Sequence, residues 1–168
     1  MVVYFGLGSN LGDRRAELAR AISAMATLGR VAASSALYET DPEGGADQPR
    51  YLNAAVRLET GLSARALLHA CLDIERAQGR VRPAGGGKAS RTIDIDLLLY
   101  GETAIKEAGL CVPHPSLLAR PFVRIPLAEV ALPGLCHPIT GESLSECPSD
   151  STVRRIGQLA SSPAGGSS

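Results

Sequence analysis

"RTIDIDLLLYG", residues 91–101, is the segment with the strongest preference for a β-strand. Side chains alternate between the two faces of a strand. Ile93, Ile95 and Leu97 therefore share one face, which suits a protein core, whereas Asp94 and Asp96 share the other. The sequence predicts a strand that packs on a core with one face and presents two carboxylates, about 7 Å apart, on the other.

These paired carboxylates allow two interpretations. Two like charges repel each other unless a cation lies between them, and oxygen donors without His or Cys suit Mg²⁺, which in turn suggests phosphate chemistry. Alternating polar positions can equally mark a solvated sheet face. One guanidinium group can donate two hydrogen bonds to phosphate oxygens, so basic residues nearby favour the metal interpretation. Such residues are also common on solvated loops. Those directly upstream are Arg80, Arg82, Lys88 and Arg91.

Composition limits the class of protein. The 168 residues suit a single domain, and 45% hydrophobic with 20% charged residues is ordinary for a soluble protein. Seventeen basic residues balance 17 acidic ones, so no long-range attraction to nucleic acid or to an anionic membrane is expected. The four cysteines form no CxxC pair, and the N-terminus has no basic segment followed by a long apolar run. We expect a cytoplasmic monomer with reduced thiols and small-molecule partners.

Hydrophobic periodicity predicts the order of the elements. A strand at 2–8 precedes a helix capped by Asp13 and stopped by Gly29. Strands at 31–40 and 51–60 follow, separated by a long loop, and a second helix begins after Ser63 and ends at Gly79. Two such β/α/β passes predict an α+β domain of ferredoxin-like type, with a mainly antiparallel sheet and packed helices. We expect this single domain to span 1–140, followed by a C-terminal extension, 141–168, with a disordered end.

Four further polar residues are candidates for a site. Tyr51 and Asn53 share the strand face opposite Leu52, where they could stack on and hydrogen-bond a planar heterocycle or simply lie exposed. Glu75 lies on the apolar stripe of the second helix, either at a frayed end or aimed into a cleft. His114 lies between two prolines, where a structural role is the more common one.

Several motifs together resemble a known enzyme family. In chain order they are "GSNLGD" (8–13), "DQPRYLNA" (47–54), "IERAQGRVR" (74–82), "RTIDIDLLLYG" (91–101) and "VPHPSLLARPFV" (112–123). Their order and spacing closely resemble 6-hydroxymethyl-7,8-dihydropterin pyrophosphokinase of folate synthesis, over about residues 2 to 130. The resemblance implies a ferredoxin-like fold and transfer of pyrophosphate from ATP to the pterin hydroxymethyl group, with release of AMP.

The resemblance also implies roles for individual residues. Asp94 and Asp96 match aspartates that hold two Mg²⁺ ions, and with Arg80 and Arg91 they form the implied catalytic set. The residues implied to bind ATP are Arg82, Lys88, Leu97, His114 and Arg120. Those implied to bind the pterin are Thr40, Pro42, Tyr51, Asn53, Glu75 and Phe122. Family members often carry a Trp in a WGPR-like stretch before "TIDID", whereas this chain has no Trp and reads "GGGKAS" before Arg91.

Two other functions remain open from the sequence. Another two-metal enzyme acting on nucleotides could use the same acid pair without needing the aromatic residues. A ferredoxin-like RNA-binding module would use aromatic residues to stack on bases, but zero net charge and only two Phe argue against it.

Overall fold

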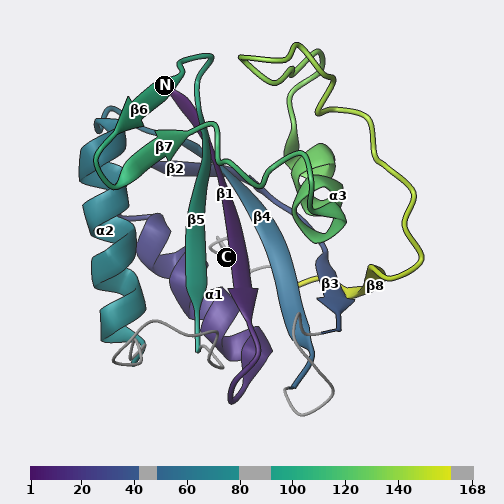
Figure 1. Ribbon diagram of the computed structural model, residues 1–168. Helices are drawn as coiled ribbons and strands as arrows, with labels where there is room; N and C mark the ends of the chain where they lie inside the picture. Colours follow the sequence, from purple (N-terminus) through teal and green to yellow (C-terminus); the bar gives the residue numbers. More distant parts are fainter. Residues whose placement is uncertain (42–48, 80–91, 160–168) are drawn as a thin grey trace, which may run out of the picture.

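The structure is a computed structural model that describes residues 1–41, 49–79 and 92–159 (Figure 1). Within these ranges the chain forms three helices and eight strands. In chain order they are β1 (Val2–Ser9), α1 (Arg14–Met25), β2 (Arg30–Ser34), β3 (Leu37–Thr40), β4 (Tyr51–Glu59), α2 (Ala64–Ala77), β5 (Asp94–Tyr100), β6 (Ile105–Glu107), β7 (Leu110–Val112), α3 (Pro121–Val130) and β8 (Arg154–Gly157).

The main sheet has the strand order β5-β1-β4-β3-β8, and β2 also pairs with β4. All pairs between these strands are antiparallel. The central strand β1 lies between β5 and β4, the last two strands of a β-α-β-β-α-β unit, which is the ferredoxin-like arrangement. The predicted fold class, a single α+β domain with a mainly antiparallel sheet, is therefore confirmed.

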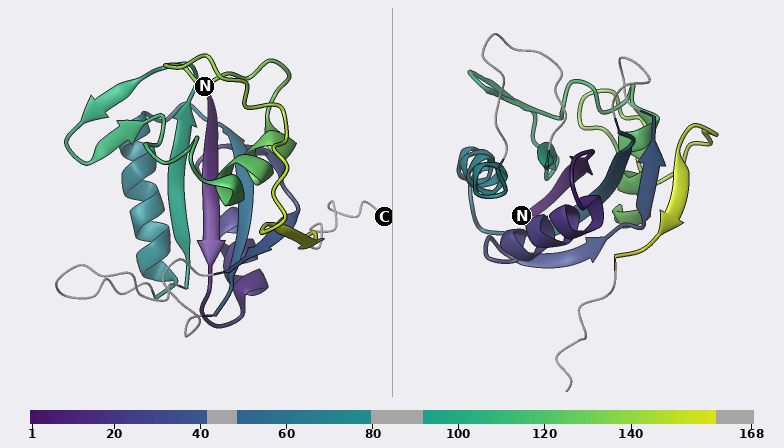
Figure 2. Two further views of the ribbon diagram at one scale, coloured as in Figure 1. Left: turned by 45° about the vertical axis from the view of Figure 1, so that its right-hand side comes forward. Right: turned by 90° about the horizontal axis from the view of Figure 1, so that it is seen from below.

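Helices cover both faces of this sheet, but unequally. α1 and α2 lie on one face, and α3 lies on the other (Figures 1 and 2). The α1/α2 face holds the larger core, in which Phe5, Leu18 and Leu67 are fully buried. The α3 face holds a smaller cluster that includes Leu99 and Leu127. The part of this second face that α3 leaves uncovered is where polar side chains can bind a ligand.

A bulge in β5 adjusts which side chains reach each face. Phe5 pairs with Leu97 and Tyr4 pairs with Leu99, so Leu98 is an extra residue on β5. Leu97 belongs to the α1/α2 core, whereas Leu98 and Leu99 both pack in the cluster under α3. The strand therefore supports both cores beyond the bulge and keeps its regular alternation only from Asp94 to Leu97.

Both helix starts agree with the sequence, because Asp13 accepts a hydrogen bond from the Ala16 amide and Ser63 accepts one from the Ala66 amide. The second helix ends as expected before Gly79, whose φ of +86° favours glycine. The first helix ends at Met25, earlier than the predicted stop at Gly29.

The strand predicted over 31–40 is in fact two strands, β2 and β3. The break lies at Ser35, whose hydroxyl accepts a hydrogen bond from the Ala55 amide at 2.8 Å. The next amide, of Ala36, donates to the Glu129 carboxylate at 2.6 Å. Because Ala36 donates to a helix side chain instead of a neighbouring strand, the strand cannot run through this position.

The C-terminal region includes a strand of the main sheet. β8 pairs antiparallel with β3, and Tyr38 is opposite Arg155 in that pair. The domain boundary at residue 140 stays a prediction, and the expected disordered end, from residue 160 on, lies outside the described residues. Among the described helices, none has an apolar run of the length required to cross a bilayer.

Candidate active site

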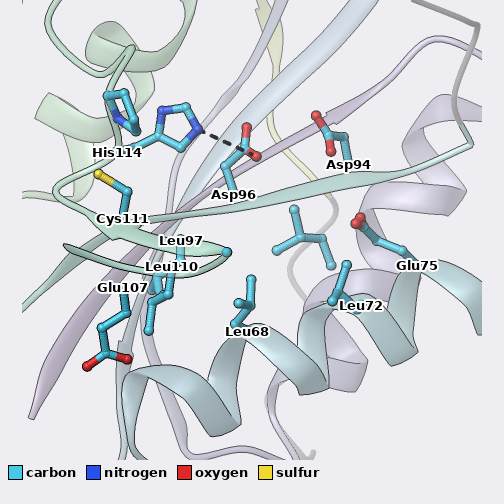
Figure 3. Close-up of a pocket in the computed structure, with 13 residues that line it drawn as sticks. Leu68, Leu72, Glu75, Asp94, Asp96, Leu97, Glu107, Leu110, Cys111 and His114 are labelled. Carbon is cyan, nitrogen blue, oxygen red and sulfur yellow. Dashed lines mark ion pairs between the residues drawn. The ribbon is translucent and has the colours of Figure 1, made fainter. Parts of the chain in front are cut away.

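The two carboxylates of β5 project together from the sheet face that α3 partly covers. Asp94 and Asp96 are half-buried, while Ile95 between them is buried in the α1/α2 core. Figure 3 shows both carboxylates on the same side of β5. The alternation predicted from the sequence is therefore confirmed, and it separates the core side of the strand from its polar side.

Glycines on β1 lie directly beside the two aspartates. Gly8 is opposite Asp94, and Gly6 is opposite Asp96. On its other side Gly8 is opposite Asn53 of β4. Asp94, Gly8 and Asn53 thus form one row across three strands, and the middle position of the row has no side chain. Since neighbouring strands are about 4.8 Å apart, this row leaves open backbone about 10 Å wide between a carboxylate and an amide.

The orientation of the Asn53 amide follows from its hydrogen bonds. Its Nδ2 donates to Thr40 Oγ1 at 2.9 Å and to the Tyr38 carbonyl at 3.4 Å. A carbonyl only accepts, so this contact fixes Nδ2 on the β3 side. The acceptor Oδ1 then points toward Gly8, where a Cβ would stand 3.4 Å from it. Asn53 therefore presents a hydrogen-bond acceptor to the open row.

His114 lies beside Asp96, near the bulge of β5. Its backbone amide donates to the Leu98 carbonyl at 2.9 Å, and its Nδ1 accepts from the Ser116 amide at 3.1 Å. Because Nδ1 accepts, the neutral ring carries its proton on Nε2, which lies 3.9 Å from Asp96 Oδ1 (Figure 3). Burial and the Arg120 charge lower the pKa of His114, although Asp94 opposes them. His114 thus offers a neutral N–H donor beside Asp96.

A cavity of about 350 Å³ lies along the outer edge of β5, between that strand, α2 and the β6–β7 hairpin. Its apolar wall contains Leu68, Leu72, Leu97 and Leu110. Its polar rim contains Glu75, Asp94, Asp96 and His114 (Figure 3). The cavity joins an apolar surface, suited to a flat ring, to the two carboxylates.

Glu75 belongs to this cavity. The residue is only 3% exposed although it carries a carboxylate. It lies in the last turn of α2 and lines the cavity together with Asp94. Of the two alternatives left open by the sequence, the structure selects the carboxylate aimed into a cleft.

The residues expected from "ARPFV" begin helix α3. Arg120 is the N-cap residue, and Phe122 lies in the first turn behind Pro121. The Arg120 guanidinium carbon lies 5.7 Å from the centroid of the Phe122 ring, within cation–π range. Both residues are half-buried, and α3 contacts β4, β1 and β3 on the same face as Asn53 and Asp94.

Glu129 fixes the other end of α3 to β3. One carboxylate oxygen accepts from the Tyr38 hydroxyl at 2.7 Å, and the other accepts from the Ala36 amide at 2.6 Å. The Arg57 guanidinium adds a bond of 2.6 Å to the Val130 carbonyl. These contacts set the position of the helix that carries Arg120 and Phe122.

Arginines surround the acidic residues on either side of Thr40. Arg14 and Arg50 each contact Glu39, at 3.1 and 3.3 Å. Arg154 of β8 reaches Asp41 at 3.5 Å. Burial raises the pKa of Glu39, but the hydrogen bonds from Arg14 and Arg50 outweigh it, so the pKa is lowered. The end of β3 is thus held by residues of α1 and β8 and by the residue that precedes β4.

The carboxylates of β5 suit Mg²⁺, an ion that takes most of its ligands from water and phosphate. In the described ranges no group of three or more His, Cys, Asp or Glu side chains could hold a metal by itself. Mg²⁺ usually takes one or two carboxylates and completes its shell with substrate phosphates and water. Asp94 and Asp96 supply two carboxylates, and because both are only half-buried, water and phosphate can complete the shell of an ion held there.

The structure locates most but not all of the predicted site residues. Those it brings to one face are Thr40, Tyr51, Asn53, Asp94, Asp96, His114, Arg120 and Phe122, and it places Leu97 and Glu75 at the adjoining cavity. Pro42, Arg80, Arg82, Lys88 and Arg91 lie outside the described residues.

Sequence reasoning missed Gly6, Gly8 and Glu129. Two glycines inside an otherwise β-forming run were the available signal for the first two, since glycine in a strand often marks a close approach of another group.

Comparison with known proteins agrees with this geometry. A sequence profile of the family described as 7,8-dihydro-6-hydroxymethylpterin-pyrophosphokinase (HPPK) matches residues 4–132. A 2-amino-4-hydroxy-6-hydroxymethyldihydropteridine pyrophosphokinase of Methylorubrum extorquens is 48% identical over 145 residues, which is 85% of this chain and 89% of that protein. The Pseudomonas aeruginosa protein of the same name is 42% identical over 161 residues, 92% of this chain and 97% of its own.

Solved structures show the same fold. A Plasmodium falciparum HPPK-DHPS triple mutant aligns with 86% of this chain at a TM-score of 0.66 and 16% identity. An HPPK-DHPS crystallised with substrates aligns at a TM-score of 0.68 and 13% identity. This chain spans only 43% and 42% of those two longer chains. The profile match and the two bacterial relatives show that the chain belongs to the 7,8-dihydro-6-hydroxymethylpterin-pyrophosphokinase family.

Proposed function

We propose that the protein transfers the β,γ-pyrophosphoryl group of ATP to the hydroxymethyl oxygen of 6-hydroxymethyl-7,8-dihydropterin, at the face formed by β5, β1 and β4. One observation carries the proposal: the row Asp94, Gly8 and Asn53. It places a carboxylate suited to a metal–phosphate complex and an amide suited to a heterocycle on either side of open backbone. A phosphate and a ring bound there would face each other without a side chain between them.

The pterin side of the site is formed by β4, β3 and α3. Asn53 Oδ1 would accept a hydrogen bond from a ring N–H, because its Nδ2 is already engaged by Thr40. Tyr51 and Phe122 would contact the two faces of the ring by stacking. Thr40 and Pro42 would form the wall beyond Asn53.

The nucleotide side is formed by the cavity along β5. Leu97 and the leucines of α2 provide an apolar wall for the base, and His114 provides an N–H donor. Arg120, Arg82 and Lys88 would bind phosphate oxygens, and Arg80 and Arg91 would neutralise charge as the bond to the leaving group breaks. Glu75 lines this cavity, so we place it on the nucleotide side, although the family resemblance had grouped it with the pterin residues.

The reaction needs positioning more than a nucleophilic side chain. The hydroxymethyl oxygen attacks the β-phosphorus of ATP, and the bond from that phosphorus to the α,β-bridging oxygen breaks. AMP leaves with the bridging oxygen, and the hydroxyl proton passes to solvent. Asp94 and Asp96 would hold two Mg²⁺ ions, which when bound neutralise the negative charge of the triphosphate.

Product analysis tests this proposal. The purified protein with Mg²⁺ and ATP should release AMP only when the hydroxymethyl pterin is present, with one pyrophosphorylated pterin formed for each AMP. Release of inorganic pyrophosphate instead would indicate a nucleotidyltransferase. Absence of turnover, together with binding of RNA, would indicate a binding module.

A further inference from the structure

Gly8 occupies the centre of the proposed site, although the family motifs gave it no role of its own. The residue lies inside a regular antiparallel strand, paired with Asn53 on one side and with Asp94 on the other. Glycine within a strand is unfavourable for folding compared with alanine, because it loses more backbone freedom and packs no side chain. A glycine within an interior strand of the sheet therefore calls for a reason outside strand stability.

The space above Gly8 gives that reason. A Cβ built at Gly8 would stand 3.4 Å from Asn53 Oδ1 and 3.6 Å from Cδ1 of the Tyr51 ring. These are contacts that the strand can accommodate, since neither is closer than an ordinary or slightly tight van der Waals approach. The same methyl group would cover the one acceptor atom that Asn53 directs toward the row.

The hydrogen bonds of Asn53 fix the direction in which this acceptor points. Its Nδ2 bonds to Thr40 Oγ1 and the Tyr38 carbonyl prevent the amide from rotating its oxygen to another direction. Oδ1 is directed toward Gly8, so a donor that crosses the backbone of Gly8 can reach it. The edge of a ring stacked on Tyr51 can pass over that backbone and reach Oδ1, whereas a methyl group at Gly8 would block that edge.

We propose that Gly8 is a specificity-determining residue, which by having no side chain admits a planar ring with an edge N–H to Asn53 Oδ1. The inference rests on the proposed function, because it assigns the pterin to this row. It adds a requirement on the ligand: the ring must be flat where it crosses β1. Nucleotide binding, which uses the far side of β5, does not depend on this position.

The test is calorimetric titration of Gly8→Ala with the hydroxymethyl pterin and, separately, with a non-hydrolysable ATP analogue and Mg²⁺. We expect pterin affinity to fall by about tenfold to a hundredfold, the usual effect of removing a buried hydrogen bond. Affinity for the ATP analogue should stay within about twofold. Gly61→Ala is the matched control, because a Cβ there meets open space at the opposite end of the sheet.

A double-mutant cycle separates this role from a general packing effect. If Gly8 acts by exposing Asn53 Oδ1, Gly8→Ala should cost little further affinity in an Asn53→Ala background. That background also removes the closest contact of the new methyl group, so if Gly8→Ala alone folds poorly, comparing the double variant with Asn53→Ala still measures the effect of the methyl group in a folded protein. Equal losses in both backgrounds, unchanged pterin affinity, or failure of both Gly8 variants to fold would each overturn the proposal.

The parent protein distinguishes this failure from failure of the proposed function. A parent that binds the ATP analogue but not the pterin would refute the pterin assignment itself. A parent that binds both, with a Gly8→Ala variant that does the same, would refute only the role of Gly8.

Discussion

The hydroxyl of Tyr38 donates a 2.7 Å hydrogen bond to Glu129, and through this bond β3 holds helix α3 against the sheet. Tyr38 is also opposite Asn53 in the β3–β4 pair, and its carbonyl accepts from the Asn53 amide. One residue thus contacts both the amide expected to bind the pterin and the helix that carries Phe122. Changes at this contact should reach ligand binding as well as stability.

Replacing Glu129 by Ala should destabilise the protein more than replacing Tyr38 by Phe. Ala carries no acceptor, so the Tyr38 hydroxyl and the Ala36 amide both lose their partner, at a cost of about 1–3 kcal/mol each. Tyr38→Phe removes the donor and leaves the Ala36 bond in place. Chemical denaturation measures both, and equal stability of the two variants would contradict this account of α3 docking.

Tyr38 should also give the protein a distinctive loss of stability at alkaline pH. Burial, and then the bond to Glu129, raise the pKa of Tyr38 from 10.0 to about 12. The folded protein holds this proton more tightly than the unfolded chain, so stability from this group is present below pH 10.0 and falls as pH rises toward about 12. The stability advantage of the parent over Tyr38→Phe should therefore shrink across that range. A constant difference would exclude Tyr38 as the titrating group.

Asp94→Asn and Asp96→Asn should separate folding from catalysis. Without Mg²⁺ the two carboxylates repel each other, so either change should leave the melting temperature equal to or above that of the parent. Turnover should be nearly abolished, because an amide neutralises Mg²⁺ poorly and several kcal/mol of transition-state stabilisation, as an order of magnitude, is lost. Near-parent AMP release by either variant at saturating Mg²⁺ and ATP would contradict the metal site.

His114→Asn should show whether His114 faces the nucleotide. The Asn oxygen can accept from the Ser116 amide as Nδ1 does, so the turn should remain folded, whereas the donor at Nε2 is lost. We expect the melting temperature to stay close to that of the parent and the KM for ATP to rise by roughly tenfold. His114→Ala, which loses both contacts, should also be less stable. An unchanged KM for ATP would remove His114 from the nucleotide side.

Phe122→Ala should weaken pterin binding much more than ATP binding, because an aromatic platform contacts the ring and not the phosphates. Phe122→Leu is a useful comparison, since it keeps apolar bulk but loses the π face that also contacts Arg120. Titration calorimetry with each ligand measures the effect. Equal losses of both ligands would show that Phe122 acts by positioning Arg120 rather than by stacking.

The sequence predicted those parts of the molecule in which local chemistry determines structure. Alternation in 51–59 and 93–97 fixed the two faces, and Asp13 and Ser63 marked the helix starts, because these signals depend on neighbouring residues only. It did not predict α3, whose Pro121 and Pro126 argue against a helix. Pro121 is tolerated at the first helical position, while contacts of Glu129 with β3 help to stabilise the rest.

The site shows the same division. The two aspartates were found from spacing within one strand, and Tyr51 with Asn53 from spacing within another. That Gly8 lies between Asp94 and Asn53 depends on the register of three strands, which a single sequence does not specify. The strand break at Ser35 was not predicted for the same reason. It depends on contacts with Ala55 and Glu129, which are distant in the chain.

Strand β8 also has a consequence for the behaviour of a shortened chain. It pairs with β3 and covers hydrogen-bonding groups that would otherwise form an open sheet edge. Open edges promote intermolecular strand pairing. A chain cut after residue 140 should therefore self-associate under conditions in which the full chain does not, and light scattering would detect it. Adding a peptide of residues 150–159 should suppress that association by restoring the missing edge partner. The C-terminal strand would then protect the chain from aggregation by pairing within the same molecule.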